Sequence, residues 1–384
     1  MKQVNLKKVS LSLITATVMS LGLANCGGSS STSSTSTDTT NSYTGAGSQW
    51  DNTINETAKT FVITHRLAAG QAIDFTISGT FETLTSGFKK LTVTTSTGTD
   101  APAVGSVGYG LDIPGYAFFL QPSDSAGELI TMVAGGECPT ENVTGNWITV
   151  KNLHDVNTTT NLGTPQDVSS ATADSFGTFS WNATTSQLEL PANYALVNPT
   201  TSLGGQVPFD VNCTNGVATI TDVTMYLTSN GGLIVHAEHD SGSGNGTTDE
   251  SVINAFAAET LTATSDFDGT YAGILLSADA STSSSVKPVA LTCLAGSCTG
   301  LIIDPDTNAA PLSGGGTATL NLTSAVNTPS AGFVSGTMTT SSGSGNMTCM
   351  IDTAAAGTTK TLINCSGQNP GATTELFNMI LVSQ

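Results

Sequence analysis

From residue 50 to the end of the chain, apolar positions mostly follow the two-residue period of β-strands. Short runs rich in Val, Ile, Thr, Phe and Tyr alternate with clusters of Gly, Asn, Ser and Pro, and no long stretch has an apolar stripe at helical spacing. In residues 211–220 two alternating segments flank Asn215-Gly216, which is the strongest short-range sign of a hairpin. Segments 178–190 and 225–238 have a similar form. The pattern predicts an all-β protein built from antiparallel strands.

The spacing of these runs predicts tandem β modules. Eight candidate strands fall within residues 268–383, and residues 146–261 give a similar count. Even spacing of this kind is typical of an eight-stranded barrel or of a sandwich, and the pattern leaves both open. We therefore expect a C-terminal β module at residues 262–384 and a middle β module at residues 136–261. The strand-rich segment 50–135 is either a small domain or part of the middle module.

The first 25 residues have the layout of a secretory signal peptide. Lys2, Lys7 and Lys8 form a short basic segment, and residues 11–24 are mostly apolar but too few to span a membrane. Residues 26–49 are rich in Gly, Ser and Thr. Such low-complexity sequence cannot bury enough apolar surface to fold, so it predicts a disordered, flexible tether before the first β segment.

The junction Leu23-Ala24-Asn25-Cys26 resembles the lipobox of bacterial lipoproteins, although Asn25 departs from the Gly, Ala or Ser that the family prefers there. The resemblance implies that the Cys26 sulfur is diacylated, that the signal is cut just before it, and that the new N-terminus is acylated. Gly27 stands where an aspartate would retain a lipoprotein at the inner membrane, which implies the outer membrane. Two or more acyl chains hold a protein stably at a bilayer. The alternative is a secreted protein with Cys26 in a disulfide.

The chain is strongly acidic, with 10 Lys and Arg against 29 Asp and Glu and a formal net charge of −19. Such a surface repels phosphate backbones and lacks the basic patch that nucleic-acid binding requires. We therefore exclude nucleic acid as a partner. The membrane is the expected first partner, through the lipid, together with an unidentified partner in the envelope or outside the cell.

Six cysteines remain after the lipidated one, and an even number in an oxidising compartment predicts a disulfide framework with no free thiol. Six cysteines allow fifteen connectivities. The pairs that we favour are Cys138–Cys213, Cys293–Cys298 and Cys349–Cys365.

Two segments are candidate metal sites. If residues 233–240 form a strand, His236, Glu238 and Asp240 share one face and lie close enough to hold one ion. Asp304, Asp306 and Asn308 match the start of a calcium loop, but Ala309 and Gly315 stand where such a loop needs Gly and Glu. A solvent-facing strand and an ordinary turn explain the two segments better. We expect no resident cofactor, with a divalent cation such as calcium as the alternative.

The chain carries no GxSxG, HExxH, P-loop or GxGxxG motif, so we do not expect an enzyme. The leading hypothesis is a lipid-anchored outer-membrane protein whose β modules serve non-catalytic binding or adhesion. An exposed apolar or aromatic patch would favour it. The first alternative is a carrier of a small or lipidic ligand, which a cavity of several hundred Å³ inside a module would favour. An envelope hydrolase is the second alternative.

Overall fold

The computed structural model describes residues 39–384 apart from 46–49, 67–71, 100, 122–128, 135–137, 158–161, 166–174, 196–201, 221–222, 228–232, 241–246, 258, 278–284, 310–315, 354–358 and 371. Within this part of the chain the regular elements are strands and one short 3₁₀-helix, η2 (Thr264–Phe267). The predicted all-β class is therefore confirmed. The predicted signal peptide and Cys26 lie outside the described residues.

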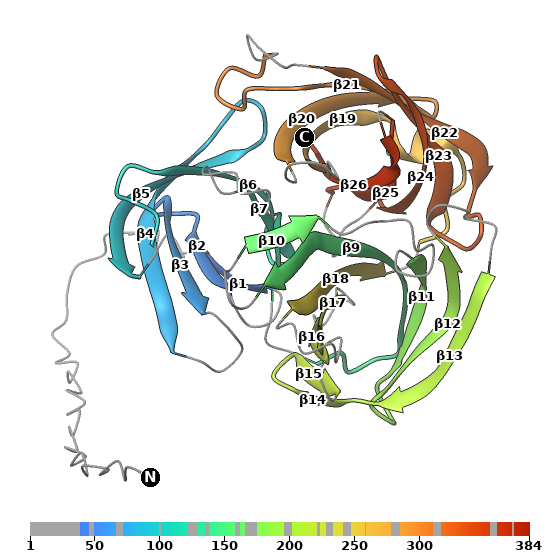
Figure 1. Ribbon diagram of the computed structural model, residues 1–384, viewed down its shortest axis with the longest axis horizontal. Helices are drawn as coiled ribbons and strands as arrows, with labels where there is room; N and C mark the ends of the chain where they lie inside the picture. Colours follow the sequence, from blue (N-terminus) through green and yellow to red (C-terminus); the bar gives the residue numbers. More distant parts are fainter. Residues whose placement is uncertain are drawn as a thin grey trace, which may run out of the picture. The chain divides into compact units, whose positions relative to one another are not determined.

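An N-terminal barrel is formed by the first eight strands, each antiparallel to its neighbours in chain order (Figure 1). They are β1 (Thr40–Gly45), β2 (Trp50–Asn55), β3 (Thr60–Arg66), β4 (Ile73–Thr83), β5 (Lys89–Gly98), β6 (Val107–Ile113), β7 (Ala117–Gln121) and β8 (Ile130–Val133). The barrel closes where Thr44 and Gly45 of β1 pair with Val133 and Met132 of β8.

Apolar side chains at alternate positions of the strands point inward and fill the interior of this barrel. In β4, Phe75, Ile77 and Phe81 are buried inside, whereas their chain neighbours are half-buried or exposed. The strands need no helix to cover the inner face, because closing the sheet brings all its inward side chains together.

The composition predicts a tether up to residue 49, but β1 begins at Thr40. That boundary is corrected by ten residues, because Thr and Tyr in this Ser/Thr-rich segment are good strand formers.

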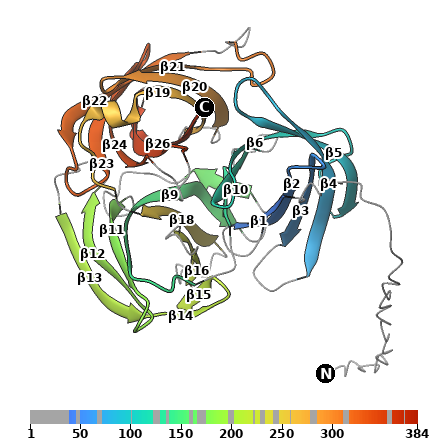
Figure 2. The same ribbon diagram turned by 180° about the vertical axis from the view of Figure 1, so that it is seen from behind.

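The middle of the chain forms an open sheet of ten strands rather than eight. They are β9 (Val143–Asn157), β10 (Leu162–Pro165), β11 (Ser175–Asn182), β12 (Gln187–Ala195), β13 (Ser202–Asp210), β14 (Asn212–Thr214), β15 (Val217–Ile220), β16 (Val223–Leu227), β17 (Leu233–Asp240) and β18 (Thr247–Ala257). Figure 2 shows β9 beside β18, whose pairing joins the two halves of this sheet. The hairpin expected at Asn215-Gly216 connects β14 and β15, with φ of 52° and 75° at these two residues, as a tight hairpin turn requires.

A second closed barrel is formed by the last eight strands. They are β19 (Gly269–Ser277), β20 (Ser285–Leu294), β21 (Ser297–Ile302), β22 (Thr317–Val326), β23 (Phe333–Thr340), β24 (Gly343–Asp352), β25 (Leu362–Asn369) and β26 (Ala372–Ser383). The sequence left barrel and sandwich open for the modules, and both eight-stranded sheets are barrels.

One buried apolar cluster contains residues from the outer faces of both barrels and from the middle sheet. The ring centroids of Phe176 and Phe333 lie 4.9 Å apart, and those of Tyr116 and Phe256 lie 6.0 Å apart. Because each sheet buries outward-facing side chains against the others, the three sheets stabilise one another. The division of the chain into separately folding domains remains a prediction.

Candidate functional site

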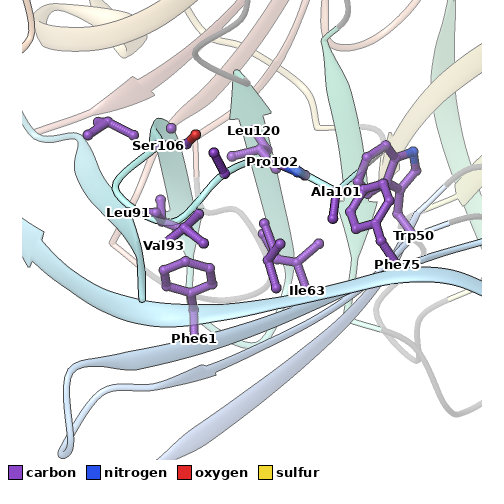
Figure 3. A pocket seen from close by; sticks show the side chains of 14 residues that line it. Trp50, Phe61, Ile63, Phe75, Leu91, Val93, Ala101, Pro102, Ser106 and Leu120 are labelled. Carbon is purple, nitrogen blue, oxygen red and sulfur yellow. The ribbon is translucent and has the colours of Figure 1, made fainter. Parts of the chain in front are cut away.

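A cavity of about 310 Å³ lies inside the N-terminal barrel. Its walls are inward-facing side chains of β2 to β7 and the connection between β5 and β6, as Figure 3 shows. The lining residues are Trp50, Phe61, Ile63, Phe75, Ile77, Leu91, Val93, Ala101, Pro102, Ala103, Ser106, Val107, Gly108 and Leu120. Nearly all of these side chains are apolar, and the volume lies at the lower end of the range of roughly 300–1,000 Å³ for small-molecule pockets.

An aromatic row lies at one end of the cavity. Trp50, His65 and Phe75 lie on paired positions of β2, β3 and β4, so their side chains share the inner face. The ring centroids are 4.4 Å apart for Trp50 and His65 and 4.8 Å apart for His65 and Phe75. Trp50 and Phe75 of this row line the cavity, and their flat apolar faces suit an aromatic or cyclic ligand.

His65 is held neutral within this row. Burial lowers the pKa of His65, although its hydrogen bond to Asp74 acts in the opposite direction. The two atoms, Nδ1 of His65 and Oδ2 of Asp74, are 3.2 Å apart. A neutral imidazole that donates through Nδ1 to the carboxylate stacks well on Phe75 without adding charge to the cavity.

A group of charged side chains fills the opposite end of the same barrel. Lys89 Nζ donates to Glu56 Oε1 at 2.6 Å and lies 3.4 Å from Asp112 Oδ2. Tyr43 donates through its hydroxyl to Asp112 Oδ1 at 2.5 Å, and Lys89 Nζ also lies 4.5 Å from the ring centroid of Phe81. We call these five residues the charged plug.

The titration behaviour of the charged plug follows from its burial. Burial raises the pKa of Asp112 to about 6, although the hydrogen bond from Tyr43 and the charge of Lys89 lower it. Burial and the negative charge of Asp112 both raise the pKa of Tyr43, which therefore stays a hydrogen-bond donor. Burial alone would raise the pKa of Glu56, but the hydrogen bonds and charges of Lys89 and Lys59 together lower it.

The cavity and the charged plug are neighbours along one strand face. Leu91 lines the cavity and Lys89 stands two residues away on the same face of β5, which corresponds to about 7 Å. The interior of the barrel is therefore apolar at the end where the connections after β1, β3, β5 and β7 lie. It is charged at the opposite end. A ligand can enter only the apolar half without displacing an ion pair.

The sequence did not identify these residues. Lys89, Asp112 and Trp50 belong to no motif, and alternation alone does not say which face of a strand becomes the inside of a barrel. The sequence did contain one signal for these residues, which is a charged residue within a strand of buried apolar ones. In β5, Lys89 stands on the same face as Leu91, and in β6, Asp112 stands between Leu111 and Ile113.

The calcium-loop candidates form a turn at an interface. Asp304 Oδ1 accepts a hydrogen bond from the backbone of Asp306, and Asn308 has a φ of 53° that closes the turn. Asp306 Oδ2 accepts hydrogen bonds from Lys90 Nζ at 2.9 Å and from the Tyr109 hydroxyl at 3.2 Å. The carboxylate of Asp306 thus links the C-terminal barrel to the N-terminal one.

The other metal candidates lie on β17. His236, Glu238 and Asp240 occupy alternate positions of that strand, as expected, but their side chains lie outside the described part of the structure. Among the residues that the structure describes, no group of three or more His, Cys, Asp or Glu side chains could hold a metal ion.

Three disulfides are present, and they are the pairs that the sequence analysis favoured. They are Cys138–Cys213, Cys293–Cys298 and Cys349–Cys365. The last two join residues that stand directly opposite on paired strands, β20 with β21 and β24 with β25, with Cα atoms 3.9 Å and 4.0 Å apart. Each of these two bridges therefore staples neighbouring strands inside the C-terminal barrel.

No family model matches the chain, and no curated protein matches it. Among solved structures, transferrin binding protein B from Haemophilus parasuis is similar with a TM-score of 0.29 and 8% identity, over 87% of this chain and 65% of that one. The same protein from Neisseria meningitidis gives a TM-score of 0.26 and 10% identity, with the same two coverages. A DUF3598-family protein of unknown function from Nostoc punctiforme gives 0.22 and 7%, over 64% of this chain and 95% of that one.

The chain thus spans 65% of the length of the two transferrin binding proteins. Likeness at these TM-scores does not support the transfer of a ligand or a partner to this chain. In the described part of the structure, no helix is long and apolar enough to cross a membrane.

Proposed function

We propose that the protein is a non-catalytic binding protein, held at the outer membrane by lipid on Cys26, whose N-terminal barrel binds a small apolar molecule. The observation that carries the proposal is the cavity of about 310 Å³ inside that barrel. A packed interior would have filled this space, because protein cores are close-packed and a void forfeits contacts. Apolar walls gain most from an apolar ligand, at roughly 25 cal/mol per Å² of buried surface.

The surroundings of the cavity favour a carrier over an adhesin. In the described residues, the exposed large hydrophobic side chains come one each from five different elements, and none is aromatic: Val62, Ile73, Val104, Leu294 and Leu301. Such scattered residues are ordinary on a protein surface. Val104 lies at the tip of the apolar connection Ala101–Ser106 beside the cavity, which suits the entry of an apolar ligand.

Gly108 offers a direct test by filling the cavity. It lines the cavity, and a Cβ placed on it would meet the Gln121 carbonyl oxygen at 3.4 Å and Leu120 Cδ1 at 3.6 Å, which are ordinary contacts. Gly108→Leu therefore extends a side chain into the cavity without forcing the backbone. Gly108→Ala is the matched control, because it adds only the Cβ.

The assay is titration with Nile red, a neutral apolar dye that fluoresces when it leaves water. We expect wild type and Gly108→Ala to bind the dye, and Gly108→Leu to lose one bound equivalent or to bind it about tenfold more weakly, which is ~1.4 kcal/mol. Circular dichroism should show that Gly108→Leu remains folded. If a folded Gly108→Leu binds the same number of equivalents with the affinity of the wild type, the cavity is not the ligand site.

A further inference from the structure

The C-terminal barrel contains a second cavity, of about 290 Å³. Its deep part is apolar and is formed by inward-facing side chains, among them Val289, Leu291, Met338, Phe377 and Met379, all buried. It opens toward the connections that follow the first, third, fifth and seventh strands of the barrel. The cavity of the N-terminal barrel opens at the corresponding end of its own sheet.

A lysine stands in the wall of this second cavity. Lys287 lies on β20, where the inward-facing positions are 287, 289, 291 and 293, and it pairs with Leu275 of β19. It is partly buried and lines the cavity. Its side chain therefore belongs to the inner face of the barrel and not to the outer surface.

Lys287 has no anion to bind within the described part of the chain. The other basic side chains described there are all engaged: Lys59, Arg66, Lys89 and Lys90 in ion pairs with carboxylates, and Lys360 in a hydrogen bond to a backbone carbonyl. In a chain with a net charge of −19, an ammonium group without a carboxylate is unusual. A partly buried charge is costly without a partner, so an anion at this point is stabilised.

Hydroxyl groups share this end of the cavity with Lys287. Thr317, Thr340, Ser341 and Ser342 line the cavity where β22 begins and where β23 turns into β24. Thr340 is half-buried and the other three are exposed, so these side chains add hydrogen-bond donors at the open end of the cavity. The cavity thus combines one cation and several donors at its rim with apolar walls below them.

We propose that the C-terminal barrel binds an aliphatic monocarboxylate, with the hydrocarbon chain among Val289, Leu291, Phe377 and Met379 and the carboxylate on Lys287. A single ammonium group matches a single negative charge, and each buried methylene adds about 0.8 kcal/mol to the binding free energy. This site is separate from the cavity of the N-terminal barrel, and it does not depend on the function proposed for that cavity.

The test compares decanoate with decanol, which has the same chain length but no charge, by calorimetric titration. The protein is the full mature chain with Cys26→Ser, so that no detergent competes. We expect the wild-type barrel to bind decanoate more tightly than decanol. Lys287→Met should weaken decanoate binding roughly tenfold to a hundredfold, which is the range for a charge-assisted hydrogen bond, and leave decanol binding unchanged. Lys287→Arg keeps the charge and should keep decanoate binding.

Lys59→Met is the matched control, because it removes the same charge from an exposed site on the other barrel. It should leave decanoate binding unchanged. In the wild type, nuclear Overhauser contacts between the decanoate chain and the Met379 methyl group locate the ligand without any substitution at Lys287. Three results overturn the proposal: no decanoate binding by the wild type, equal loss in Lys287→Met and Lys59→Met, or loss of decanoate in Gly108→Leu instead. The last result would place the carboxylate in the N-terminal barrel.

Discussion

Substitution of Lys89 by Met should destabilise the N-terminal barrel strongly. The side chain of Lys89 is 10% exposed and that of Asp112 is 2% exposed, and Lys89 Nζ is the cation that faces both Asp112 and Glu56. Removing it leaves Asp112 at one end of the barrel interior without a counter-charge, whereas Glu56 keeps its ion pair with Lys59. Removal of one partner from a buried ion pair typically costs about 3–5 kcal/mol. We expect the free energy of unfolding, measured by urea titration at neutral pH, to fall by an amount in this range.

Lys59 provides the matched control for this substitution. Its Nζ lies 3.3 Å from the other oxygen of Glu56 and 5.2 Å from the ring centroid of the same Phe81, but its side chain is 54% exposed. An exposed ion pair contributes about 0–1 kcal/mol. Lys59→Met should therefore change the free energy of unfolding by no more than that. If the two variants lost the same free energy of unfolding, burial of the charged plug would not determine how much its ion pairs stabilise the barrel.

The pH dependence tests the same reasoning independently. Folding raises the pKa of Asp112 from 3.8 to about 6. Protonated Asp112 therefore contributes its full stabilisation below pH 3.8, and this stabilisation is lost as the pH rises through about 6. Lys89 lowers the pKa of Asp112, so Lys89→Met should raise it further. The difference in the free energy of unfolding between the wild type and Lys89→Met should therefore become smaller when the urea titration is repeated near pH 5, where Asp112 becomes neutral. A deficit that stays constant from neutral pH to pH 5 would refute the assignment of the loss to an unpaired carboxylate.

Three further predictions concern the anchor, the disulfides and the domain boundary. Cys26→Ser should release the protein from membranes and from the detergent phase, and unchanged partition would exclude the lipid anchor. Replacing both Cys349 and Cys365 by Ala should cost ~3 kcal/mol of unfolding free energy in urea, from the loop of 16 residues that the bridge closes, and a loss near zero would contradict the entropic argument. A fragment that starts at Glu259, which accepts hydrogen bonds from Thr353, should show a β-type circular dichroism spectrum and one cooperative melt. An oxidised fragment that stays unfolded would mean that the C-terminal barrel needs the other sheets.

The strands could be predicted because their signal is local. Period-two alternation and turn residues such as Asn215-Gly216 act within a few residues, and the all-β class follows from them. The pairing of Cys293 with Cys298 is local too, since the turn at Ala295 and Gly296 brings the two strands together. The start of the first barrel was missed because composition describes a segment and not its partners. Residues 40–45 become a strand through pairing with β2 and β8.

The cavities could not be predicted, because they depend on how each sheet closes. Alternation divides a strand into two faces, but the faces become inside and outside only when the first and last strands pair. The charged plug illustrates the difficulty. A lysine among apolar residues is as compatible with an outer face as with an inner one until Asp112 and Glu56 are brought beside it.

Lys89 and Lys90 show how much depends on which face of a strand becomes the inside of the barrel. They are consecutive in the sequence and chemically identical, yet Lys89 points into the barrel toward Glu56 and Asp112, whereas Lys90 points outward and binds Asp306 of the other barrel. A shift of one residue in the pairing of β5 would exchange the two side chains, since a one-residue slip moves every side chain to the opposite face. The same shift would turn Leu91 and Val93 out of the cavity. The register of β5 therefore sets the charged plug, the cavity and the contact between the barrels together, and a substitution that weakens this register should affect all three.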